Sequence, residues 1–147
     1  MWYLYGFAVL AGVANAVQSG SNAMLARTFA QPFAAGLVVS TVTGATLLTV
    51  GLVSGRLSLP SADQALQAPW WAWIGGALGA LVVLSQLFVA RQIGAAPYLA
   101  LLVTAGVITS ILLDHFGWVG FEPHPAGLWR VLGAVLMVAG VALVAMT

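Results

Sequence analysis

Charged side chains are almost absent from this sequence, and long uncharged runs separate the few that occur. Only 5% of the 147 residues are charged and 62% are hydrophobic, whereas a soluble domain carries about 25% charged residues. The charged residues are Arg27, Arg56, Asp63, Arg91, Asp114, Glu122 and Arg130. This composition predicts an integral membrane protein whose main partner is the lipid bilayer, with no sizeable soluble domain.

Five runs are long enough to cross the hydrocarbon layer, which takes about 20 apolar residues in a helix. They cover residues 2–26, 32–53, 69–91, 95–115 and 128–146. Pro32 suits the first turn of the second run, and Trp70, Trp71 and Trp73 form an aromatic interfacial anchor at the start of the third. We therefore predict an all-α membrane protein, a single five-helix unit over residues 1–147, whose first helix is retained rather than cleaved as a signal peptide.

Two segments between the runs carry turn or capping signals. Ser61 and Gln64 have the spacing of a capping box, which predicts a short interfacial helix through Leu66, although a plain polar loop fits the same residues. The segment 117–127 contains glycine and proline residues that prevent a continuous helix, so we expect a loop there.

The arginines give little instruction about orientation in the membrane. With five spans, Arg56 and Arg130 fall on one side and Arg27 and Arg91 on the other, while orientation depends on an excess of Lys and Arg on one side. A half-transporter that pairs with an inverted copy is expected to show this balance, because alternating access often uses two inverted halves. A chance balance of so few charges is the alternative. Since no internal repeat is evident, the second half would come from another chain.

The strongest polar pattern lies in the first run, where Asn15, Gln18 and Asn22 are three and four residues apart. This spacing places them on one helix face, which must turn away from lipid because an unpaired amide in hydrocarbon is costly. Two interpretations are open, namely hydrogen bonds that hold helices together and the lining of a substrate cavity, and we favour the cavity. Gln86, near the middle of the third run, is equally costly to leave in lipid.

The fourth run ends in a second polar group. Ser110 and Asp114 are four residues apart on one helix face, and Val107 lies on the same stripe. An intramembrane carboxylate is a functional hypothesis by default, so Asp114 is our candidate for coupling transport to an ion. Its place near the helix end also fits an interfacial carboxylate in contact with water, His115 or an arginine.

Motifs for catalysis and nucleotide binding are absent from the sequence. It contains no HExxH, GxSxG or P-loop pattern, so we predict that the protein is not an enzyme and is not driven by ATP. The lack of cysteine excludes disulfides and thiolate metal sites, and we predict no metal and no cofactor. A net charge of +1 provides no basic surface for nucleic acid.

Three motifs stand out along the chain: the run Gln18–Leu25, the segment Pro69–Gly76 and the segment Leu112–Gly117. Together they resemble the YdcZ-like family of inner-membrane exporters, a short-chain branch of the drug/metabolite transporter superfamily. The resemblance spans nearly the whole chain. It implies a bacterial cytoplasmic (inner) membrane location, a five-helix half of an inverted-repeat bundle, and pairing with an inverted copy of itself or with a paralogous subunit. Val107 departs from the family pattern, which commonly has Gln there.

We therefore predict a secondary transporter or exporter of small organic solutes that acts as an antiparallel homodimer or heterodimer. The predicted cavity-lining residues are Asn15, Gln18, Asn22, Gln86 and Ser110. One alternative is a small dual-topology channel in which the amides line a pore. The other is a non-transporting partner subunit, which the apolar Val107 favours.

Overall fold

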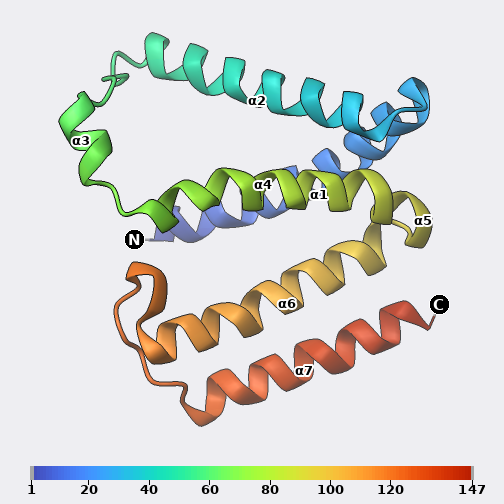
Figure 1. The fold of residues 1–147 in the computed structure, drawn as a ribbon. Coiled ribbons are helices and arrows are strands. Elements are labelled where there is room, and N and C mark those ends of the chain that lie inside the picture. Colours follow the sequence, from blue (N-terminus) through green and yellow to red (C-terminus); the bar gives the residue numbers. More distant parts are fainter. Residues whose placement is uncertain (1, 147) are drawn as a thin grey trace. The chain divides into compact units, whose positions relative to one another are not determined.

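The chain is helical in the computed structural model, which describes residues 2–146 (Figure 1). No strand occurs among these described residues. The helices gather into two compact units, the first ending at Gln92 and the second beginning at Ile93, and each is described by itself. That the whole chain acts as a single five-helix unit stays a prediction.

The first unit contains three long helical segments joined by short links. Its elements are α1 (Trp2–Phe29), α2 (Pro32–Val53), the short helix α3 (Ala62–Gln67), the 3-10 helix η1 (Trp70–Trp73), α4 (Ile74–Ser85), the π-helical turn η2 (Gln86–Ala90) and the start of α5 (Arg91–Ile93). The second unit is a helical hairpin. It consists of α6 (Ala95–Phe116), the 3-10 turn η3 (Trp118–Gly120) and α7 (Leu128–Ala145).

Four helical segments of the described chain are long and apolar enough to cross a membrane. They are Pro32–Val53, Trp70–Ile93, Ala95–Phe116 and Leu128–Ala145, which coincide with four of the predicted runs to within two residues at each end. Helix α1 has 28 residues but a lower mean hydropathy, because Asn15, Gln18 and Asn22 interrupt its apolar sequence. A fifth span therefore stays a prediction, although α1 is long enough at about 1.5 Å per residue.

Local sequence explains the starts of two helices, α2 and α3. Pro32 occupies the first turn of α2, where its missing N–H leaves no hydrogen bond unmade. The predicted capping box is formed before α3, since Ser61 Oγ accepts from the Gln64 N–H at 3.3 Å and Gln64 Oε1 accepts from the Ser61 N–H at 3.0 Å. The short helix is therefore confirmed over a plain loop.

The chain reverses direction after α6 through an ordered loop. Gly117 ends α6 with a φ of +65°, a left-handed conformation that glycine adopts without strain. The loop then folds back on the helix end, because the His124 N–H donates to the Asp114 carbonyl oxygen at 2.7 Å and the Ala126 N–H donates to His115 Nδ1 at 3.1 Å. These contacts fix the position at which α7 begins.

The core of the first unit lies where α1, α2 and η2 meet. Ala26, Ala35 and Leu87 have no exposed surface there. Helices α1 and α4 run in the same direction and α2 runs opposite to them (Figure 1). Gly36 allows a close approach, since a Cβ at this position would lie 3.4 Å from Leu87 Cδ1. This small core lies beside the polar residues of α1.

Apolar side chains are exposed along the helices of both units. Trp2 and Phe7 of α1 and Leu136 of α7 are each more than 60% exposed within the chain. Such large apolar surfaces are unfavourable in water and favourable in hydrocarbon. The three tryptophans of η1 are exposed at the beginning of the span Trp70–Ile93, where interfacial anchors belong, and that role stays a prediction.

Candidate functional site

A buried glutamine joins two asparagines in the first unit. Gln86 Oε1 accepts a hydrogen bond from Asn22 Nδ2 at 2.6 Å, and Gln86 Nε2 donates to Asn15 Oδ1 at 3.3 Å. Asn22 and Gln86 are 3% and 1% exposed, and Asn15 is half-buried. We call these three residues the amide clasp. They connect α1 to η2, whose first residue is Gln86.

Helical periodicity explains which polar side chains of α1 face inward. Asn15, Ser19 and Asn22 recur every three to four residues, and the last two are buried. Gln18 lies beside this row, and its side chain is exposed with no hydrogen-bond partner among the described residues. Of the predicted stripe, Asn15 and Asn22 therefore meet at Gln86, while Gln18 does not join them.

Ser19 is a buried polar residue that the prediction did not include. Its side chain has no exposed surface, and its hydroxyl has no partner within the described chain. A serine hydroxyl in a helix can bond to the carbonyl four residues earlier, as Ser21 does with Val17 at 3.1 Å. A buried hydroxyl that stays without any partner would cost about 1–3 kcal/mol. Its spacing from Asn15 and Asn22 is the sequence signal that would have identified it.

The helical register changes at the glutamine of the amide clasp. Residues Gln86–Ala90 form the π-helical turn η2, and such turns occur frequently at functional sites. The ring of Phe88, in this turn, packs edge-on against Phe33 of α2, with ring centroids 5.9 Å apart. No proline or turn motif marks this segment, so nothing in the sequence indicates the π turn.

Ser110 and Asp114 lie in the second unit, in a groove of about 400 Å³ between α6 and α7 that also contains Val107. The Asp114 carboxylate forms an ion pair with Arg130, with Nη1 and Oδ2 3.3 Å apart and both side chains partly exposed. The contact with an arginine that was considered for Asp114 is therefore present. An ion pair at this exposure contributes about 0–1 kcal/mol, and its part in coupling stays a prediction.

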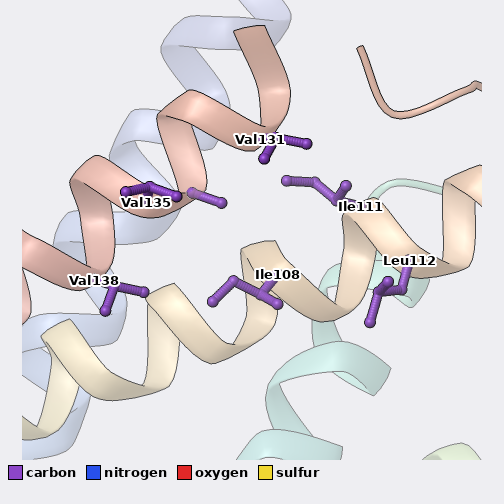
Figure 2. A pocket seen from close by; sticks show the side chains of 7 residues that line it. Ile108, Ile111, Leu112, Val131, Val135 and Val138 are labelled. Carbon is purple, nitrogen blue, oxygen red and sulfur yellow. The ribbon is translucent and has the colours of Figure 1, made fainter. Parts of the chain in front are cut away.

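A second groove between α6 and α7 is lined by apolar side chains (Figure 2). The lining residues are Ile108, Ile111, Leu112, Val131, Ala134, Val135 and Val138. This groove offers no side-chain hydrogen bond to a polar solute. Within residues 2–146 no three His, Asp or Glu side chains gather in a way that could hold a metal ion.

Apolar spans that enclose a few paired polar side chains define a multi-pass membrane protein. Residues 3–143 match the family model described as "Putative inner membrane exporter, YdcZ", and the chain belongs to this family. Membership confirms the family resemblance seen in the sequence. It also confirms a multi-pass protein of the cytoplasmic membrane, in a family described as exporters.

The chain is also similar to a curated protein, "Inner membrane protein YdcZ" of Escherichia coli (strain K12). The two are 37% identical over 76 residues, which cover 52% of this chain and 50% of the relative. The match thus spans about half the length of that relative. No solved structure matches the chain.

The hydrogen bond between Asn22 and Gln86 predicts energetic coupling in a double-mutant cycle. Asn22→Ala, Gln86→Ala and the double variant should give a coupling free energy of about 0.6–1.7 kcal/mol, the range found for hydrogen bonds between membrane helices. Unfolding free energies in a detergent or bicelle system provide the measurement. Gln18→Ala combined with Gln86→Ala is the matched control, and we expect no coupling for it. Equal coupling in both cycles would contradict the clasp.

Proposed function

We propose that the protein is a secondary exporter of small organic solutes that works as an antiparallel pair of five-helix chains, with α1 as the fifth span. Membership of an exporter family supports export. The observation that carries the proposal is the concentration of amides on α1, where Asn15, Gln18 and Asn22 occur in one helix. Amides are unfavourable in lipid unless they are paired or lie in a wet cavity.

Gln18 is the residue on which the proposed site depends most. Its amide is exposed on α1 and has no partner in the described chain, whereas Asn22 and Gln86 bond to each other. An unpaired amide on a membrane-spanning surface requires a cavity or a partner chain to cover it. We therefore propose that Gln18 lines the solute cavity, with Asn15, Asn22 and Gln86 next to it and Ser110 as a further lining residue.

The positions of the arginines support the antiparallel pair. Arg27 lies in the last turn of α1 and Arg91 follows η2, so both are at the same end of the parallel helices α1 and α4 (Figure 1). Arg56 comes after α2, at the opposite end. Basic residues at both ends leave the orientation of the chain weakly determined. The partner is proposed to be an inverted copy or a paralogous subunit.

A non-transporting partner subunit is the second candidate, because Val107 contributes an apolar side chain to the groove of Ser110 and Asp114. In that case this chain alone would give no flux, and co-expression with a paralogous subunit would restore it. A channel, by contrast, would give flux that does not saturate at low solute concentration.

Replacement of Gln18 tests the proposed site without disturbing the amide clasp. Gln18→Ala should lower solute flux in proteoliposomes by about tenfold or more. The reason is that the variant would lose the proposed hydrogen bond between Gln18 and the solute, and such a bond is worth about 1–3 kcal/mol. Labelled malonamide, lactate and choline serve as neutral, anionic and cationic solutes, and the variant is compared on whichever one the wild-type protein moves. Melting temperature should be unchanged, since Gln18 has no partner.

Ser21→Ala is the matched control on the same helix, because the Ser21 hydroxyl is exposed and bonds to its own backbone. It should retain wild-type flux. Wild-type flux from Gln18→Ala, or an equal loss in both variants, would contradict the proposed site.

An inverted homodimer predicts that a loop of the chain reaches both sides of the membrane. Ser58→Cys places a single thiol in the exposed loop between α2 and α3, in a chain that has no other cysteine. A membrane-impermeant maleimide should label it in intact spheroplasts and also in inverted vesicles, with about half reacting from each side. Labelling from one side alone would refute the inverted homodimer and would leave a paralogous subunit of opposite orientation as the only form of the proposed pair.

A further inference from the structure

We propose that the amide clasp is a latch, by which we mean that its hydrogen bonds open to bind a solute. The solutes it would bind are neutral and carry both hydrogen-bond donors and acceptors, as carboxamides do. This inference rests on the proposed function and names the class of solute that the site would take. It also includes Ser19, which neither the sequence prediction nor family membership assigns. Four observations support it: the bonding pattern of the clasp, the absence of charge within it, the unpaired Ser19 hydroxyl and the π-helical turn at Gln86.

The clasp presents equal numbers of donors and acceptors at its two hydrogen bonds. The donors are Asn22 Nδ2 and Gln86 Nε2, and the acceptors are Gln86 Oε1 and Asn15 Oδ1. If Gln86 moved away from α1, all four groups would lose their partners in a water-poor environment. A solute can separate the clasp at low cost only if it supplies acceptors for the donors and donors for the acceptors.

Charged solutes cannot meet this requirement. An ammonium group has donors only and a carboxylate has acceptors only, so each would leave half of the clasp unsatisfied. The clasp and Ser19 themselves supply no counter-charge, and the nearest charged residues along the chain, Arg27 and Arg91, are exposed. An unpaired charge buried in an apolar protein interior is far more costly than a neutral polar group.

In this proposal Ser19 provides a further group that binds the solute, and η2 is the segment that moves when the latch opens. The Ser19 hydroxyl is both a donor and an acceptor, is fully buried, and is unpaired in the closed clasp, so it is available to a solute. The π turn at Gln86–Ala90 holds one residue more than an α-helical turn of the same rise. Its conversion to α-helix would change the direction of the Gln86 side chain relative to α1 and so open the clasp.

The test measures protection of a thiol placed at Ser19. Ser19→Cys is a nearly isosteric change, and its thiol would be the only one in the chain. The full chain in lipid nanodiscs is labelled with 2-hydroxyethyl methanethiosulfonate in the presence of malonamide, malonate or 1,3-diaminopropane, which share a three-carbon chain and differ in charge. Malonamide should slow labelling by about tenfold once it exceeds its dissociation constant about tenfold. Malonate and 1,3-diaminopropane should leave the rate unchanged at equal ionic strength.

Ser58→Cys provides the control, because Ser58 lies in the exposed loop between α2 and α3 and should be labelled at the same rate with or without each solute. Should Ser19→Cys fail to fold, Ala23→Cys, one turn further along α1, replaces it. Protection by either charged solute, or no protection by malonamide, would overturn the neutral class. A thiol that no reagent reaches would show that the clasp does not open, and would also overturn the inference.

The outcome can be separated from that of the proposed function, because thiol protection requires binding and not transport. Protection by malonamide without flux of any solute would refute the exporter and leave the latch standing. Flux with protection by a charged solute would refute the latch and leave the exporter standing.

Discussion

The hydrogen bond between two side-chain amides at the contact of α1 with η2 organises the polar interior of this protein. In hydrocarbon an amide without a partner is costly, so Asn22 and Gln86 have to find each other or water. Their pairing at 2.6 Å fixes which face of α1 turns toward the segment Trp70–Ile93. The small apolar core of Ala26, Ala35 and Leu87 lies next to this bond and depends on the same helix orientation. A change in the clasp therefore affects both the packing of the first unit and the polar surface that it offers.

The sequence predicted the elements well because membrane spans follow from length and hydropathy. Four runs were located to within two residues at each end, and the capping box at Ser61 formed as expected. The polar site was predicted only in part. Amide spacing alone could not choose between Gln18 and Ser19, which are adjacent on the helix and differ by about 100° in direction. That choice depends on where α1 meets η2, and nothing in the sequence indicates the π turn that sets this contact.

The proposed mechanism has an uncharged part, the amide clasp, and a charged part, the ion pair of Asp114 with Arg130. The clasp holds only neutral groups, while the one carboxylate in the helical spans that has an ionic partner, Asp114, lies near the end of α6 and pairs with Arg130. The part of Asp114 in coupling transport to an ion stays a prediction. The proposed exporter would thus recognise its solute by hydrogen-bond pattern and not by charge, which differs from transport of cations through an intramembrane carboxylate.

Hydrogen exchange of the asparagine side chains tests the amide clasp most directly, because Asn15 and Asn22 are the only asparagines in the chain. Selective ¹⁵N labelling of asparagine in lipid nanodiscs gives one side-chain amide signal pair for each. Asn22, which donates to Gln86 and is 3% exposed, should exchange with water far more slowly than a free asparagine, and Gln86→Leu should remove the protection. Exchange at Asn22 as fast as in a free asparagine would contradict the account.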